Sequence, residues 1–230
     1  MELFEFKDTF CCSLFKETKY NTSLRPGLLG NLFQNNVKIE CEFIANNNGK
    51  TQYIFSKQGI INSGVYIKDN VIIFELALSS DNTNFADEII PLIFPFEYDK
   101  NHSIIYQIDS ENKIFKITFD DEIKEIKFDG NVSDYSNVPL WIGTSNPFVQ
   151  NKNYFSGFIS KFKISDNEDV VSDIDFTNVN RFKILDKSGN GNHAYIEEYG
   201  NPLLQERLNI LIAGNPLKGS TITNIKQTLV

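Results

Sequence analysis

Residues 37–45 read VKIECEFIA, and this stretch decides the fold class. Apolar side chains occupy every second position from Val37 to Phe43, and charged side chains occupy the positions between them. Successive side chains of a β-strand point to opposite faces, so this period of two predicts a strand with one buried and one solvated face.

The same alternation recurs in residues 72–78, 104–108, 115–119 and 158–164, the last with Phe158, Ser160, Phe162 and Ile164 expected to face inward. Asn-, Asp- and Gly-rich clusters such as 46–49, 68–70, 109–112 and 120–122 separate these segments and predict short turns. Many short strands with almost no helical pattern between them predict an all-β fold of two packed antiparallel sheets, not a βαβ fold.

The composition favours a water-soluble globule. The 230 residues include 20 Phe and 9 Tyr, the mean hydropathy is -0.27, and no apolar run is long enough for a transmembrane helix. A net charge of -8 disfavours the binding of nucleic acid and insertion into a membrane. Three cysteines, two of them adjacent at Cys11 and Cys12, predict reduced structural thiols.

The chain ends define the expected domain organisation. The start, MELFEFKDTFCC, does not resemble a secretory signal, which favours a virion or another assembly that the Sec pathway does not export. Residues 1–200 are expected to form one domain with its core at about 30–197. Residues 201–230 are expected to be a C-terminal appendage, helical or extended, that docks on the sandwich edge or on a neighbouring subunit.

Three later motifs extend the strand pattern: VPLWIGTSNP from Val138, NYFSGFISKFKISD from Asn153 and LDKSGNGNHAYI from Leu185. Gly157 is expected where a strand bends or a neighbour approaches closely, and Trp141 is expected to anchor the inner face. Together with residues 37–78 and 101–128, these motifs resemble the laminin G-like and pentraxin-like branch of the concanavalin A-like jelly rolls. The resemblance covers about three quarters of the chain.

This resemblance implies a two-sheet antiparallel jelly roll that recognises sugars, lipids or proteins, often with calcium at its rim. We therefore expect a non-catalytic carbohydrate-binding or adhesive module, displayed on a larger assembly such as a phage particle or a cell surface. A virion assembly or decoration protein is the alternative, and a homo-oligomer or a component of a larger particle is expected in either case. Candidates for stacking on a sugar are Tyr53, Phe85, Tyr135, Phe148 and Tyr154.

The Gly-Asn-rich motif formally satisfies a calcium loop. Its ligand positions are Asp186, Ser188, Asn190, Asn192 and Glu197. The flanking segments look like strands rather than the helices of an EF-hand, so a structural turn is the favoured interpretation and calcium the alternative. No cofactor is required by either interpretation.

Two stretches of the sequence partly match catalytic or nucleotide-binding patterns. Asp173 and Asp175 have the alternate spacing of glycosidase carboxylates, but the third acid of that signature is missing, which leaves a glycoside hydrolase as a minor alternative. GNPLKGST at 214–221 almost spells a phosphate-binding loop, but Lys218 precedes the second glycine instead of following it. We therefore expect no enzymatic activity.

Overall fold

The computed structural model describes residues 4–6, 10–14, 36–58, 62–80, 86–133, 140–145, 153–180 and 183–198. Within these ranges the chain forms β-strands joined by turns, and no helix occurs there. The predicted all-β class is confirmed. The expected appendage at 201–230 lies outside the described residues.

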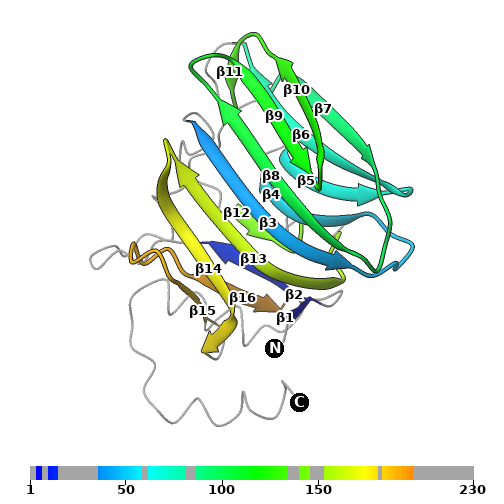
Figure 1. The fold of residues 1–230 in the computed structure, drawn as a ribbon, viewed down its shortest axis with the longest axis vertical. Helices are drawn as coiled ribbons and strands as arrows, with labels where there is room; N and C mark the ends of the chain where they lie inside the picture. The colour runs from blue at the N-terminus through cyan, green and yellow to red at the C-terminus, as the bar shows by residue number, and fades with distance from the viewer. Residues whose placement is uncertain are drawn as a thin grey trace.

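One layer of the sandwich is an antiparallel sheet in the order β10-β9-β8-β3-β13-β14, with β1 paired to β13 (Figure 1). The confirmed alternation is clearest in β3, where buried and half-buried residues alternate without a break from Val37 to Ala45. The bounds are β1 Phe4–Phe6, β3 Val37–Ala45, β8 Asn101–Asp109, β9 Ile114–Phe119, β10 Glu122–Lys127, β13 Gly157–Asp166 and β14 Asp169–Asn180.

The second layer lies behind the first in Figure 1 and has the order β16-β2-β12-β4-β5-β6, with β7 and β11 both paired to β6. Strand β15 pairs with β14 and β16, so one ladder of hydrogen bonds runs from the first layer into the second. The bounds are β2 Phe10–Leu14, β4 Gln52–Gln58, β5 Asn62–Lys68, β6 Val71–Ser79, β7 Glu88–Pro95, β11 Asn131–Val132, β12 Leu140–Ile142, β15 Lys183–Asp186 and β16 Ala194–Glu198.

Aromatic side chains join the two layers across the core. The ring of Phe55 in β4 lies edge-on to Tyr106 of β8 at 5.6 Å and to Phe162 of β13 at 5.5 Å between centroids. Edge-to-face contacts at this distance are favourable beyond the area they bury. The Tyr106 hydroxyl also donates to the carbonyl oxygen of Glu75 in β6 (2.9 Å), so its polar end is satisfied inside the core.

The predicted inward face of residues 158–164 is wrong in its first half. Ile159 is fully buried, whereas Phe158 and Ser160 are only half-buried. The register against β3 shifts between Ile159 and Lys161, which marks Ser160 as the extra residue of a β-bulge. One extra residue exchanges the two faces of a strand, so the prediction is correct only beyond the bulge, at Phe162 and Ile164.

The prediction for Trp141 also needs correction. The indole is buried, with 1% of its surface exposed, but its neighbours Leu140 and Ile142 are the residues of β12 that join the inner core. Alternation along β12 therefore directs Trp141 to the other face of the sheet, where it lies opposite Ser56 of β4.

Gly157 occupies a position that no other residue fits. A β-carbon built there would lie 2.0 Å from the carbonyl oxygen of Ile44, and the backbone φ is 144°. Of the two features that the sequence allows at this glycine, the close approach of a neighbour is confirmed, and that neighbour is β3.

Candidate functional site

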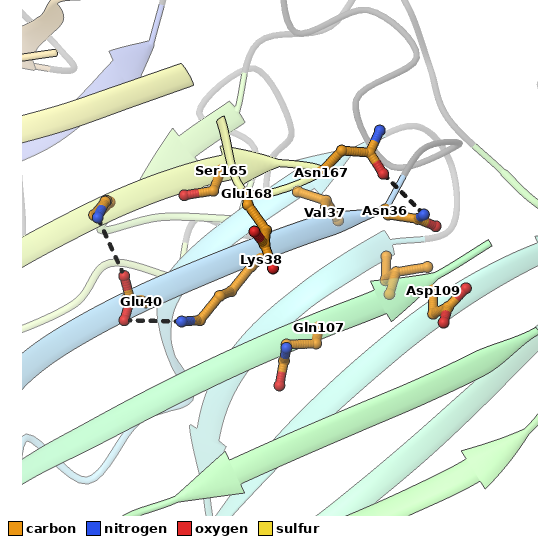
Figure 2. A pocket seen from close by; sticks show the side chains of 11 residues that line it. Asn36, Val37, Lys38, Glu40, Gln107, Asp109, Ser165, Asn167 and Glu168 are labelled. Carbon is orange, nitrogen blue, oxygen red and sulfur yellow. Dashed lines mark hydrogen bonds and ion pairs between the residues drawn. The ribbon is translucent and has the colours of Figure 1, made fainter. Parts of the chain in front are cut away.

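A groove of about 700 Å³ lies on the outer face of the first layer, over β3, β8 and β13 (Figure 2). This volume falls within the range of small-molecule sites in proteins. The groove is lined by Asn36, Val37, Lys38, Glu40, Gln107, Ile108, Asp109, Lys163, Ser165, Asn167 and Glu168.

Strand register places the floor of the groove in rows across the sheet. Lys38 of β3 lies opposite Gln107 of β8 on one side and opposite Ser165 of β13 on the other. The next outward residue of β3, Glu40, lies opposite Lys163. Because the alternate residues of β3 fill the core, the residues between them must face outward and form this polar floor.

Glu40 holds both lysines of the groove. Its Oε1 lies 3.2 Å from Lys38 Nζ and its Oε2 lies 3.9 Å from Lys163 Nζ, as the dashed lines of Figure 2 mark. Each oxygen of the carboxylate therefore serves one ammonium group. All three side chains are partly exposed, so the ion pairs fix the arrangement of the floor more than they stabilise the fold.

Hydrogen bonds from Asn36 fix the end wall of the groove. Its Nδ2 donates to Asn167 Oδ1 (2.9 Å) in the turn between β13 and β14, and its Oδ1 accepts from the Ser110 backbone N–H (2.9 Å) after β8. At the same end, the side-chain amide and backbone N–H of Asn112 both donate to the Asp109 carboxylate (2.8 Å each). These hydrogen bonds lower the pKa of Asp109, and the bond from the Asn112 side chain has the largest effect.

Two uncharged polar side chains of the floor remain available to a ligand. Neither the Gln107 amide nor the Ser165 hydroxyl forms a side-chain hydrogen bond with any other group in the described part of the chain. Gln107 is half-buried and Ser165 is 6% exposed, so both are held in place by the surrounding sheet. Together they offer donors and acceptors on either side of Lys38.

Of the aromatic candidates, the two that the structure describes do not line this groove. Tyr53 lies in β4 of the other layer, half-buried and stacked on Tyr66 of β5 with ring centroids 4.9 Å apart. Tyr154 is half-buried and forms an isolated bridge with Thr144. Phe85, Tyr135 and Phe148 lie outside the described residues.

A hydrogen bond accompanies the tyrosine pair on that outer face. The Tyr66 hydroxyl donates to Glu75 Oε1 (2.8 Å). Burial raises the pKa of Glu75, and the hydrogen bond from Tyr66 partly opposes this shift. Burial, followed by the contact with Glu75, also raises the pKa of Tyr66 far above its ordinary value.

In the predicted calcium loop, the Asp186 carboxylate already accepts four hydrogen bonds. Oδ1 accepts from the backbone N–H groups of Asp173 (2.8 Å) and Ser188 (2.9 Å). Oδ2 accepts from the Ser188 hydroxyl (2.7 Å) and the Asn192 backbone N–H (2.9 Å). The Asn190 Nδ2 donates to the Val170 carbonyl oxygen (2.6 Å), which ties the turn to β14.

Strands β15 and β16 flank this turn, and Glu197 lies in β16 with a side chain outside the described set. The described part of the chain contains no group of three or more His, Cys, Asp or Glu side chains placed to hold a metal ion. Calcium binding at the turn stays a prediction.

Of the two carboxylates at glycosidase spacing, Asp173 lies in β14 opposite Lys163. Asp175 lies in the same strand, and its side chain is outside the described set.

In the described ranges no helix is long and apolar enough to cross a membrane.

The groove could not be found from the sequence, because its residues come from segments 36–40, 107–109 and 163–168. In each segment, outward polar residues alternate with core residues as on any solvated sheet face. Only the pairing of β3 with both β8 and β13 brings them together.

No protein-family model and no curated protein sequence matches the chain. Solved structures with the same fold include domains LG4-5 of the mouse laminin alpha1 chain, with 12% identity and a TM-score of 0.50 over 87% of this chain and 48% of that chain. This protein thus spans about half the length of that laminin fragment.

Two bacterial structures are also similar. A candidate carbohydrate-binding protein from Bacteroides ovatus has 11% identity and a TM-score of 0.60, over 88% of this chain and 62% of that chain. The CBM40 domain of the Ruminococcus gnavus IT-sialidase, bound to alpha2,3 sialyllactose, has 18% identity and a TM-score of 0.50, over 75% of this chain and 90% of that chain. The chain therefore has the two-sheet antiparallel jelly-roll fold of laminin G-like and concanavalin A-like domains.

Proposed function

We propose that the protein is a carbohydrate-recognition module without catalytic activity, and that its ligand binds in the groove over β3, β8 and β13. The observation that carries this proposal is the row of Gln107, Lys38 and Ser165 across three adjacent strands. A sugar hydroxyl both donates and accepts hydrogen bonds, and this row offers an amide, an ammonium group and a hydroxyl to it. A rigid sheet holds these groups at fixed spacing, which lowers the entropic cost of binding.

The carboxylates of the groove favour binding over hydrolysis. A glycosidase needs one carboxylic acid with a raised pKa and a second free carboxylate. Here the Glu40 carboxylate is held between two lysines, and hydrogen bonds lower the pKa of Asp109. Asp109 therefore lacks the environment of a general acid, and the ion pairs occupy the oxygens of Glu40.

The fold supports the proposal without identifying the ligand. The bacterial domain with bound sialyllactose and the candidate carbohydrate-binding protein have the same architecture as this chain. A shared fold hosts many functions, so the sugar bound by a neighbour is not assigned to this protein.

The test is to substitute Gln107→Ala and compare it with Ser103→Ala. Both residues lie on the outer face of β8, but only Gln107 lines the groove. Binding of wild type is first located on a glycan array, and the dissociation constant for the best glycan is then measured by titration calorimetry.

We expect Gln107→Ala to weaken binding about three- to tenfold, which corresponds to one lost hydrogen bond, and Ser103→Ala to leave it unchanged. Thermal unfolding of each variant checks that the fold is intact. An array without signal, or equal affinities for both variants, would refute the assignment, and turnover of the glycan would favour a hydrolase.

Display in several copies follows from this proposal. A single shallow sugar site of millimolar affinity supplies only about 4 kcal/mol of binding free energy. Linked copies raise the avidity by roughly 10² to 10⁴ without new contacts. We therefore propose that the module acts as part of a multimeric assembly, such as a particle or a cell surface.

One observation favours assembly as a second candidate function. Four large apolar side chains are exposed on β7 and β10, which border the two layers at the same end of the sandwich (Figure 1). They are Ile89, Ile93, Ile123 and Ile126. Concentration-dependent oligomerisation together with a silent glycan array would favour this function over sugar recognition.

A further inference from the structure

The arrangement of charged side chains in the groove bears on the charge of the ligand that can bind there. Lys38 and Lys163 are the two cations of the lining, and both contact the one carboxylate of Glu40. Figure 2 shows Glu40 beside Lys38, with an interaction marked from each oxygen of its carboxylate. A carboxylate or sulfate on a ligand would have to compete with Glu40 for either ammonium group.

The remaining charges of the lining are negative. Asp109 and Glu168 bring a second and a third carboxylate to the end of the groove. Two hydrogen bonds from Asn112 stabilise the charged form of Asp109, and Glu168 is exposed to water. Three carboxylates thus outweigh two lysines in the lining of the groove, on a chain whose net charge is already -8.

A ligand that binds the uncharged groups of the groove meets neither competition from Glu40 nor repulsion by the carboxylates. The Gln107 amide and the Ser165 hydroxyl meet no other side-chain partner in the described chain, so a ligand hydroxyl displaces no existing protein bond there. A hydroxyl group also carries no charge for the carboxylates to repel.

We propose that the groove selects neutral oligosaccharides and rejects acidic ones, and that Glu40 sets this selectivity by holding both lysines. This inference rests on the proposed function, since it concerns the ligand of the same site. It adds the chemical class of that ligand and the residue that determines it.

The double substitution Glu40→Gln and Glu168→Gln tests the inference. It leaves Asp109 as the one carboxylate in the lining of the groove beside two lysines, while glutamine keeps the size of each side chain. Asp173 lies opposite Lys163 and remains able to pair with it, so Lys38 is the ammonium group expected to become free.

A matched control changes the net charge equally outside the groove. Glu42 lies on the same face of β3 and pairs with Lys161 (3.8 Å), and Glu122 of β10 pairs with Lys124 (3.1 Å). Glu42→Gln with Glu122→Gln therefore removes two carboxylates, each from an ion pair on the same layer.

The assay is native affinity electrophoresis at fixed ionic strength, in gels that contain one soluble polysaccharide each. Xyloglucan, galactomannan and mixed-linkage glucan serve as neutral probes, and polygalacturonate and hyaluronan as acidic probes. We expect at least one neutral polymer and neither acidic polymer to retard wild type.

The groove variant should gain affinity for an acidic polymer by about tenfold, and 0.5 M salt should remove this gain. Its affinity for the neutral polymer should change less than threefold, and the control should behave like wild type.

The outcomes separate the two proposals. Retardation of wild type by an acidic polymer as strongly as by a neutral one would overturn the selectivity but leave sugar recognition standing. A groove variant that gains no affinity for an acidic polymer would also overturn the selectivity and leave sugar recognition standing. Wild type that no polymer retards would refute the proposed function, and the selectivity with it.

Discussion

Asp186 shows how much one carboxylate contributes when its neighbours all donate to it. Its burial alone would raise the pKa, but the four hydrogen bonds outweigh burial and the pKa is lowered. A carboxyl whose pKa is lower in the folded state stabilises the fold fully above its unfolded pKa of about 3.9. That contribution is lost as the pH falls through the folded value.

We predict that Asp186→Asn lowers the free energy of unfolding by about 2–4 kcal/mol at pH 7, because an amide offers one acceptor oxygen where four donors converge. The measurement is urea unfolding at pH 7 and at pH 3. The gap between variant and wild type should narrow at pH 3, because the unfolded state is mostly protonated below its pKa of about 3.9 and part of the contribution of the carboxylate is lost.

Asp121→Asn is the control for Asp186, since Asp121 is exposed in a turn, and its effect should stay below about 0.5 kcal/mol. A gap that is equal at both pH values would contradict the linkage argument. Repeating the pH 7 measurement with calcium and with a chelator tests the calcium prediction for the same turn, since calcium bound to the folded state raises its stability.

Among the connecting elements, the two-residue turn between β13 and β14 combines a favourable and an unfavourable residue. Asn167 and Glu168 both have positive φ, at 48° and 74°. Such turns match the twist of a hairpin and favour Asn followed by Gly, since a β-carbon is strained in the left-handed region. Glu168 therefore costs stability where it lines the groove.

We predict that Glu168→Gly raises the free energy of unfolding by about 0.5–1 kcal/mol, because relief of this strain exceeds the extra entropy glycine loses on folding. Thermal and urea unfolding measure the gain. Asn70→Gly, in the turn between β5 and β6 where φ is 61°, is the control and should gain less, since Asn tolerates this conformation. Destabilisation by Glu168→Gly would show that the Glu168 side chain stabilises the turn.

How far an element could be predicted from sequence depended on its regularity. Strand β3 keeps its alternation for nine residues, so its inward face could be assigned directly. Strand β13 also alternates apolar and polar residues over much of its length, but the bulge at Ser160 reverses the faces midway. Nothing local distinguishes Ser160 from a residue of a regular strand, because the bulge is defined by the register against β3.

At the scale of the whole molecule, the fold could be predicted and the groove could not. Core packing repeats a pattern that any strand displays, whereas the groove depends on which strands become neighbours. Of the five aromatic candidates for sugar stacking, the two in the described part of the chain, Tyr53 and Tyr154, do not line the groove. A polar row such as Gln107, Lys38 and Ser165 looks like solvated surface until the pairing is known.

The unpaired edge of the second layer, at β7, is protected against pairing with another chain. Strand β7 pairs only with β6, so its other edge is unpaired in the described chain, and it carries the exposed Ile93. Proline occurs at two positions of this strand, Pro91 and Pro95, which lack a backbone N–H. From β10, Lys124 Nζ donates to the Ile93 carbonyl oxygen (2.6 Å) and so occupies an acceptor of β7.

We predict that Pro91→Val combined with Pro95→Val converts the protein into concentration-dependent oligomers, because two restored N–H groups complete an apolar edge for pairing with a second copy. Size-exclusion chromatography with light scattering across a hundredfold concentration range measures this. Thr118→Val adds a β-branched apolar residue to the interior strand β9 and should leave the mass unchanged. Adding Ile93→Lys to the double variant should restore the mass of wild type, and a double variant that matches wild type throughout would mean that the prolines do not protect this edge.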